Sequence, residues 1–313
     1  MQNRRKFIQS ISAAGISPFF IKNFELFDYK KGFRASLNPG SIGLRCNANE
    51  LLDYAILYKF SSISPLLGDL IKFKDYERKS YLAKMERNDI KFDSGGLQFF
   101  LDFRTSDSKF EEGFQFLKKH IKTITSFSIS SLVTWIIPTH KRLTYIQNFD
   151  QHQERLTKVA IVLDEAGLKL GLEFVGPKTL MARDKYPFLH TIEGLRELIS
   201  AIGKNNVGYL LDSFHTYCAE DDYRQMEFLK ADDIVSVQLN DAVVGRTPAT
   251  QFDLERELPG DTEIIDLKKF LDFILSKGYN GAVSVEPFNK KLNLMETSAK
   301  LKRVRSSLFK VGV

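Results

Sequence analysis

The sequence predicts a single parallel (β/α)8 barrel, the TIM barrel fold, and three observations support this prediction. Short apolar segments alternate with amphipathic segments along residues 40–310, in the order that strands and helices take in such a barrel. Glycine follows several predicted helices, where a left-handed residue is needed. A length of 313 residues with 43% hydrophobic residues suits one such barrel. A doubly wound sheet is the main alternative, but no glycine-rich phosphate loop follows the first expected strand.

The first half of the chain contains four expected strands, each a short apolar segment bounded by turn residues. We expect them at 41–44, 60–63, 90–92 and 127–137. Helical spacing of apolar residues predicts helices around 51–56, at 66–86 and at 111–121, and a loop at 94–97. Four strands, the first three each followed by a helix, therefore account for this half of the barrel.

The second half of the chain repeats the pattern with longer apolar segments, as expected for strands buried on both faces. Strands are expected at 168–174, 207–212, 234–239 and 282–286. Helices are expected at 153–166, 191–202, 223–229, 266–276 and 294–308. Gly167, Gly203 and Gly278 each follow one of these helices and predict where it ends.

Residues 1–30 have the character of a targeting segment and linker, not of part of the barrel. Arg4 and Arg5, followed by Lys6, Phe7 and Ile8, resemble the twin-arginine export motif, which predicts a periplasmic protein. The apolar run at 11–21 is too short and interrupted to span a bilayer, so no stable membrane insertion is expected. The alternative is a basic N-terminus on a cytoplasmic protein.

The charge and the cysteines exclude some classes of protein. The net charge of +6 comes from Lys and Arg scattered among Asp and Glu, which argues against a nucleic-acid partner. Cys46 and Cys218 are the only cysteines, so a cysteine zinc site is excluded. Two free thiols are favoured over a disulfide.

Four expected strands of the second half each end on a side chain that can bind a metal: Glu173, Asp212, Gln238 and Glu286. The carboxyl ends of barrel strands meet at one mouth, where active sites lie. Any one of these residues could be a solvated side chain or a cap, but four at the same end favour one site. Their oxygen atoms suit a divalent ion such as Mn²⁺, Mg²⁺, Co²⁺ or Zn²⁺.

Several motifs resemble the xylose-isomerase-like TIM barrel family, the sugar phosphate isomerase/epimerase group, over about residues 40–310. The motifs are Leu172-Glu173, Leu211-Asp212-Ser213-Phe214-His215, Val237-Gln238-Leu239-Asn240-Asp241, Val285-Glu286-Pro287, and Arg256 followed by Pro259-Gly260. The family shares its fold with endonuclease IV. That branch uses extra histidine ligands for a three-zinc cluster, which this chain, with five histidines, does not match.

The resemblance implies one divalent metal held by Glu173, Asp212, Gln238 and Glu286, although many members have His where Gln238 stands. It implies a metal-dependent isomerase or epimerase of a sugar or keto-sugar. Glu173 and Glu286 would exchange a proton on opposite sides of a carbon, through a metal-stabilised enediolate. His215 would hold a substrate oxygen, and Arg256 an anionic or polar tail of the substrate.

Trp135 and His140, at the end of the fourth expected strand, are candidate walls of the sugar site or simply packed side chains. The alternative functions are a lyase, a dehydratase or a 3-keto-glycoside-cleaving enzyme on the same scaffold, and a non-catalytic sugar-binding module. The expected partner is a small-molecule sugar. Homo-oligomers are common in the family that the chain resembles.

Overall fold

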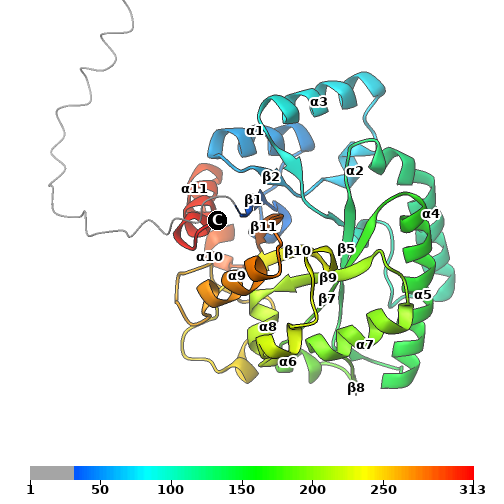
Figure 1. The fold of residues 1–313 in the computed structure, drawn as a ribbon. Coiled ribbons are helices and arrows are strands. Elements are labelled where there is room, and N and C mark those ends of the chain that lie inside the picture. Colours follow the sequence, from blue (N-terminus) through cyan, green and yellow to red (C-terminus); the bar gives the residue numbers. More distant parts are fainter. Residues whose placement is uncertain (1–31) are drawn as a thin grey trace, which may run out of the picture. The chain divides into compact units, whose positions relative to one another are not determined.

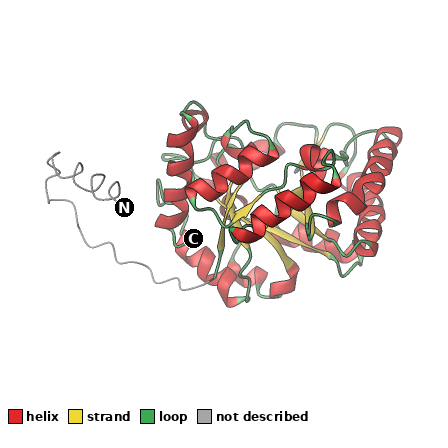
Figure 2. Cartoon of the chain, turned by 90° about the horizontal axis from the view of Figure 1, so that it is seen from above, coloured by secondary structure: helices red, strands yellow, loops and turns green. Residues whose placement is uncertain are grey.

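The computed structural model describes residues 32–313, so the expected targeting segment at 1–30 lies outside the described residues. A sheet of parallel strands forms the centre, in the order β3-β2-β1-β11-β10-β9-β7-β5-β4. The strands are β1 (Arg34–Leu37), β2 (Ser62–Ile63), β3 (Lys91–Phe92), β4 (Gly95–Gly96), β5 (Ser131–Ile136), β7 (Lys169–Phe174), β9 (Val207–Asp212), β10 (Ile234–Leu239) and β11 (Ala282–Val285). Helices surround them, as Figures 1 and 2 show.

One segment of the chain closes the sheet into a barrel. Strand β3 pairs with β2 at one end of the strand order, and β4 pairs with β5 at the other end. Only Asp93 and Ser94 separate β3 from β4, so the two short strands together form one interrupted strand of the barrel. With β3 and β4 counted as one, the barrel has eight parallel strands, and the predicted fold is confirmed.

The first strand is not where the sequence predicted it. The expected strand at 41–44 is wrong, because Gly40–Ile42 form a 3-10 turn that ends at Gly43, with φ +61°. The true first strand is β1, ahead of the expected start of the barrel at 40. Arg34 and Ser36 make β1 look polar, and Ser36 is fully buried inside the barrel, so a search for apolar runs misses this strand.

Three other expectations in the chain need smaller corrections. The expected helix at 66–86 is two helices, α2 (Leu67–Leu70) and α3 (Asp75–Arg87). The expected loop at 94–97 contains β4. The expected helix at 223–229 is a 3-10 turn, Tyr223–Met226. The expected strands at 207–212 and 234–239 match β9 and β10.

Local sequence signals set the ends of several helices. Asn47 and Glu50 form a reciprocal capping box at α1 (Ala48–Tyr58), and Thr144 and Gln147 do so at α5 (Tyr145–Glu165). Gly203, with φ +63°, ends α7. The remaining helices are α4 (Asp107–Thr125), α6 (Lys178–Met181), α7 (Ile192–Ile202), α8 (Ser213–Ala219), α9 (Leu267–Ser276), α10 (Lys290–Asn293) and α11 (Thr297–Lys310).

A two-stranded antiparallel sheet, β6 (Thr139–His140) with β8 (Tyr186–Pro187), lies outside the barrel sheet. One apolar core joins the barrel interior to the helices that cover it. From residue 32 to residue 313, none of the helices combines the length and the apolar character needed to cross a membrane.

Candidate active site at the barrel mouth

The structure brings the four strand-end residues together. Glu173 lies on β7, Asp212 ends β9, Gln238 lies on β10, and Glu286 follows β11. Asp212 and Gln238 are direct neighbours in the strand register. The side chains of Glu173 and Asp212 are almost fully buried, and that of Glu286 is 17% exposed. A buried acidic cluster at this edge of the barrel matches the position where such folds place their chemistry.

Gln238 lies at the centre of the acidic cluster. In the orientation that satisfies both ends of its amide, its nitrogen donates to Asp212 Oδ2 at 3.2 Å, Glu173 Oε1 at 3.3 Å and Glu286 Oε2 at 3.1 Å. An amide NH₂ has only two hydrogens, so it cannot satisfy three carboxylates. The opposite orientation places the amide oxygen against the same three oxygens, an arrangement that needs a cation among them.

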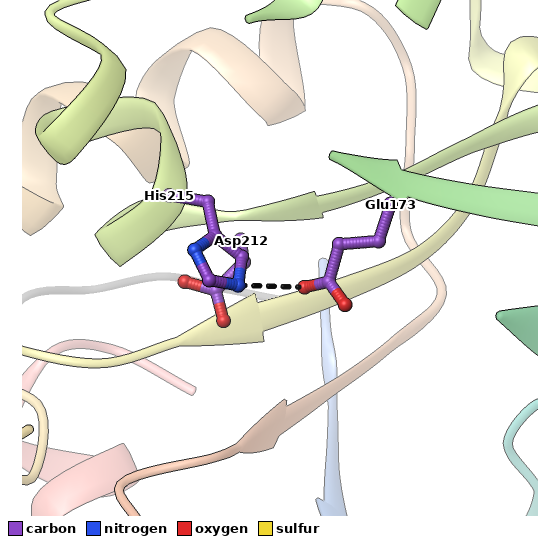
Figure 3. Close-up of side chains that lie close together, drawn as sticks. All are labelled: Glu173, Asp212 and His215. Atoms are coloured by element: carbon purple, nitrogen blue, oxygen red, sulfur yellow. Dashed lines mark ion pairs between the residues drawn. The ribbon is translucent and has the colours of Figure 1, made fainter. Parts of the chain in front are cut away.

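The donor set fits a divalent metal. Neighbouring oxygen ligands of an octahedral Mg²⁺ lie about 3 Å apart, since each bond is about 2.1 Å long. The Gln238 amide atom lies at similar distances, 3.1–3.3 Å, from one oxygen each of Asp212, Glu173 and Glu286. A second set also fits, because Glu173, Asp212 and His215 each bring one ligand atom within 4.8 Å of the others. Both sets contain Glu173 and Asp212, and Figure 3 shows the second.

Arg256 is the positive charge within this cluster, and it is 2% exposed. Its guanidinium donates to Asp212 Oδ2 at 3.1 Å, to Glu286 Oε2 at 3.3 Å and to Asp253 Oδ1 at 2.7 Å. Burial alone lowers the pKa of Arg256, but the charges of Asp212 and Asp253 outweigh burial and raise it. One guanidinium faces four carboxylates once Glu173 is included, so the cluster keeps surplus negative charge.

Two aromatic rings hold the Arg256 guanidinium in place. Its central carbon lies 4.8 Å from the centre of the Phe214 ring and 5.3 Å from that of Phe288. Phe288 has φ +44°, in the left-handed region that a bulky residue rarely adopts. Such strain persists only where surrounding contacts impose it, and it is common at functional sites.

Burial, together with the surplus negative charge, raises the pKa values of the carboxylates. Burial raises the pKa of Glu173 well above its ordinary value, and the nearby charges of Glu286 and Asp212 raise it further. Burial also raises the pKa of Glu286; Arg256 lowers it in part, and Asp212 and Asp253 raise it again. Carboxyl groups tuned in this way accept protons more readily than ordinary ones, as a general base must.

His215 lies on α8 with its ring facing Glu173 (Figure 3). Its Nε2 is 3.6 Å from Glu173 Oε1 and 3.3 Å from Arg256 Nη2, and its Nδ1 is 3.3 Å from the Gly176 backbone N–H. Burial and the Arg256 charge lower the pKa of His215 well below its usual value, so the ring is neutral. A neutral ring accepts only one of these two N–H groups, and its other nitrogen carries the proton.

Gly176 allows the chain to pass close to His215. A Cβ atom at this position would lie 2.2 Å from the His215 carbonyl oxygen. Any other residue would therefore push the segment after β7 away from α8, together with the N–H that faces the imidazole ring. The position of His215 thus depends on a glycine that carries no functional group.

Asn240 and Ser213 connect the strands beneath the cluster, and the sequence analysis assigned them no role. The Asn240 side chain donates to Asp212 Oδ2 at 2.8 Å and accepts from the Glu286 backbone N–H at 2.8 Å. The Ser213 hydroxyl donates to the Asn240 carbonyl and accepts from its N–H. The sequence gives one indication of their role: Ser213 follows Asp212 directly, and Asn240 lies two residues after Gln238.

Asp241 anchors the loop that carries Arg256 and Asp253. Its carboxylate accepts from the backbone N–H groups of Ala242, Thr262, Glu263 and Ile265. Asp241 also pairs with Glu257 through two backbone hydrogen bonds. One fully buried carboxylate thus holds both ends of a long loop at the barrel mouth.

Two cavities of about 480 Å³ and 670 Å³ open at the mouth. Glu173, Glu286 and Trp135 line both cavities. Gln238 lines the first, and His215 and Arg256 line the second. Of the two predicted wall residues, Trp135 therefore lies at the site.

His140 lines neither of these two cavities. Its ring accepts from the Arg142 and Leu143 backbone N–H groups at 3.1 and 2.8 Å, which stabilises the turn before α5. Its placement favours the packing alternative.

A parallel barrel with paired carboxylates, a histidine and a buried arginine at its mouth has the side chains needed for acid–base chemistry. Residues 56–307 match the family described as xylose isomerase-like TIM barrel, and the chain belongs to that family.

Curated relatives include enzymes of two reaction types. Inosose isomerase of Halalkalibacterium halodurans is 26% identical over 159 residues, 50% of this chain and 52% of the relative. Inosose isomerase of Bacillus velezensis is 23% identical over 254 residues, 78% and 83% of the two chains. A 3-dehydroshikimate dehydratase of Pseudomonas aeruginosa is 31% identical over 112 residues, 36% of this chain and 18% of the relative. The first of these matches spans about half the length of its relative.

Solved structures share the fold. A xylose isomerase domain protein from Alicyclobacillus acidocaldarius superposes with a TM-score of 0.78 at 25% identity, over 89% of this chain and 98% of its own. An IolI protein with a bound zinc atom superposes with a TM-score of 0.73 at 20% identity, over 89% and 98% of the two chains.

Proposed function

We propose that this protein is an isomerase or epimerase of a sugar or keto-sugar, which moves a proton at a carbon beside a carbonyl group. The observation that carries the proposal is the pair of buried carboxylates, Glu173 and Glu286, at the junction of two cavities. Burial raises the pKa of both. The inosose isomerase relatives support the same reaction class.

Each residue of the cluster has a role in the proposed reaction. Glu173 removes the proton, and Glu286 returns it from the other side or to the neighbouring carbon. The neutral His215 ring directs a nitrogen at a substrate oxygen, and Arg256 lowers the cost of gathering the carboxylates. Asn240 orients Asp212 through a 2.8 Å hydrogen bond.

Glu173, Asp212, Gln238 and Glu286 are the residues that we propose hold one divalent cation, with Mn²⁺, Mg²⁺, Co²⁺ and Zn²⁺ as candidates. When bound, such a cation supplies positive charge beside the negative charge that develops on a substrate oxygen during proton removal. The support is the surplus of carboxylates over guanidinium groups and the place of the Gln238 amide among three carboxylate oxygens. An amide oxygen is a weaker ligand than imidazole, so Gln238→His would change the metal preference.

Solvent deuterium exchange tests the acid–base assignment. The protein, loaded in turn with each of the four cations, is incubated in D₂O with a panel of keto-sugars and inososes, and incorporation is followed by NMR. Glu173→Gln and Glu286→Gln keep the shape of the side chain but remove its charge. We expect each to slow exchange about 10²- to 10⁴-fold, the usual contribution of a general acid or base.

Glu227→Gln is the matched control, because Glu227 is 67% exposed and pairs with Lys277 on the surface. It should exchange deuterium at the wild-type rate. Circular dichroism and thermal unfolding establish that the two site variants fold. Wild-type exchange rates in both site variants would overturn the acid–base assignment, and no exchange by the wild type with any ligand would overturn the proposed function.

A lyase or dehydratase is the second candidate, favoured by the dehydratase relative. Its reaction starts with the same C–H cleavage, and the proton goes to a carboxylate. The electron pair then forms a carbon–carbon double bond, and a neighbouring C–O bond breaks. The leaving oxygen departs with a proton as water or an alcohol. Mass spectrometry of the product separates this outcome from isomerisation, which leaves the mass unchanged in H₂O.

We also propose export to the periplasm by the twin-arginine route. The support is the sequence Arg4-Arg5-Lys6-Phe7-Ile8, which lies outside the described residues. Cell fractionation followed by N-terminal sequencing tests this proposal. A shortened protein in the periplasmic fraction is expected, and a chain that keeps Met1 in the cytosolic fraction would overturn it.

A further inference from the structure

The mouth has room on two sides of the proposed reacting carbon. The cavity of about 480 Å³ and the cavity of about 670 Å³ share Glu173, Glu286 and Trp135. Each volume alone lies in the range of about 300–1,000 Å³ that holds a drug-sized ligand. A free monosaccharide therefore leaves one of the two cavities unused.

The two cavities differ in chemistry. The first is the more polar of the two: Asn38, Ser64, Asp93, Ser94, Gln98 and Ser236 line it, beside apolar residues such as Leu66, Leu67 and Phe99. The second has apolar walls beyond its inner end, formed by Ile137, Val175, Leu180, Phe252, Leu254 and Phe288. A ligand that fits both has a hydroxyl-rich part and an apolar part.

The outer wall of the second cavity exposes two large apolar side chains, Phe252 and Leu254. Phe252 is 49% exposed and Leu254 is 61% exposed, and both stand on the loop anchored by Asp241. Neighbouring apolar side chains exposed around a cavity are typical of a binding surface, since their burial by a ligand is favourable.

The loop segment that carries these side chains is held by its own hydrogen bonds. The fully buried Gln251 side chain bonds to the Val243 N–H, the Val243 carbonyl and the Arg246 carbonyl. Thr179, on α6, donates to the Gln251 carbonyl at 2.6 Å. Arg246 lies over the Phe252 ring at 4.7 Å. A wall built in this way is formed before the ligand arrives, which reduces the entropy lost on binding.

We infer that the second cavity is a compartment for an apolar or aromatic group attached to the sugar, so that the substrate is a glycoside-like conjugate of a keto-sugar and not a free sugar. The sugar ring lies in the first cavity, with the reacting carbon at Glu173 and Glu286, and the apolar group lies against Phe252 and Leu254. This assignment of the substrate class rests on the proposed function.

The only tryptophan of the chain provides a direct probe, because Trp135 lines both cavities. Phenyl and methyl glycosides of the same sugars (gluco, galacto, manno and xylo) are titrated into the metal-loaded full chain while Trp135 fluorescence is followed. At least one phenyl glycoside should bind tenfold or more tightly than its methyl counterpart. Equal affinities for every pair, or no saturable change with any phenyl glycoside up to its solubility limit, would overturn the inference.

Variants of the apolar wall test whether Phe252 and Leu254 cause the preference for phenyl glycosides. Phe252→Ser with Leu254→Ser should remove the preference for the phenyl group and leave the affinity for the methyl glycoside unchanged. Phe309→Ser is the matched control, since Phe309 is 63% exposed on α11 and lines neither cavity. A preference that survives the double substitution would overturn the inference. So would light scattering that shows a dimer in the wild type and a monomer in the double variant, because the apolar wall would then belong to a subunit interface.

Deuterium exchange separates the two proposals. The substrates compared are free keto-sugars and phenyl glycosides that carry a ring ketone, so that both have a C–H beside a carbonyl group. Exchange that proceeds equally well with both kinds of substrate would support the proposed function and contradict the compartment. A strong phenyl preference in binding, without exchange into either the free keto-sugars or the phenyl keto-glycosides, would support an apolar compartment and contradict the isomerase.

Discussion

Within residues 32–313, an arginine and a histidine are buried together at the barrel mouth and again on α5. On α5, Arg155 donates to the carbonyl oxygens of Phe103 and Thr105 at 2.7 and 2.8 Å. Its one carboxylate partner, Asp107, has a side chain that is 99% exposed. His152, one turn away, stacks on Phe103 and bonds to the Asn148 carbonyl. This arginine is satisfied mostly by neutral acceptors.

At the barrel mouth, the buried arginine is paired mainly with carboxylates instead of backbone carbonyls. Arg256 faces three carboxylates directly, from Asp212, Asp253 and Glu286, and His215 lies 3.3 Å from its guanidinium. The carboxylates outnumber the positive charge, and the low-dielectric surroundings make that surplus costly. A buried arginine with neutral partners therefore indicates structure, whereas a surplus of buried charge indicates a site that takes up a cation or a proton.

Removing each arginine in turn gives the largest expected effect. Arg256→Met leaves several buried carboxylates without their positive partner and should cost about 3–5 kcal/mol of unfolding free energy, together with the catalytic activity. Arg155→Met should lower the free energy of unfolding by about 1–3 kcal/mol, because the backbone carbonyls of Phe103 and Thr105 lose their hydrogen-bond donor. The activity per folded molecule should remain at the wild-type level in the α5 variant.

Urea unfolding and deuterium exchange on the same preparations check this pair of predictions. An Arg256→Met protein as stable as the wild type would mean that the carboxylates at the mouth are protonated or dispersed, and the contrast with α5 would fail.

The pH dependence of stability tests the α5 cluster. Burial lowers the pKa of His152 from 6.5 to about 4; the Asn148 carbonyl opposes this shift, while Arg104, Arg155 and His140 add to it. Between those pH values the unfolded chain binds more protons than the native one, so stability falls as the pH drops from 6.5 to 4. The expected loss from this residue is about 3 kcal/mol in all.

His152→Leu serves as the comparison for the pH series. Its free energy of unfolding should depend less steeply on pH between 6.5 and 4 than that of the wild type, as measured by urea unfolding in matched buffers. Parallel curves for the two proteins would show that His152 is not held neutral by its surroundings.

Two buried asparagines give the smallest effects and the sharpest contrast. Asn240→Ala removes the bridge between Asp212 and the Glu286 backbone, and should cost about 1–3 kcal/mol. Loss of a group that orients a ligand side chain should also lower activity about 10- to 100-fold. Asn148 is equally buried, but its side-chain amide makes no hydrogen bond within residues 32–313.

Asn148→Ala should therefore change stability by less than about 1 kcal/mol, because no satisfied polar group is lost, and leave activity unchanged. Thermal unfolding measures the stability of both variants, and deuterium exchange rates measure their activity. Similar losses of activity from the two substitutions would show that Asn240 acts through general packing and not through Asp212.

The sequence was informative where the fold buries long apolar strands. The expected strands at 207–212 and 234–239 coincide with β9 and β10, and the side chains at their ends meet as expected. β1 was missed because its buried face is polar, with Ser36 inside the barrel. Asp253 was missed because its partner, Arg256, is positioned by contacts with distant strands that no local pattern records.

Asp241 has a consequence for how new specificities arise. The Asp241 carboxylate binds the backbone at both ends of the loop. The residues between Ala242 and Thr262 can therefore be replaced while the two ends of the loop keep their positions. Mutation or grafting within the loop can remodel the wall of the second cavity around Phe252 and Leu254, provided that Asp253 and Arg256 are retained. Under the assignment proposed for the second cavity, directed evolution confined to this loop should change which substituent is accepted and leave Glu173, Asp212, Gln238 and Glu286 in place.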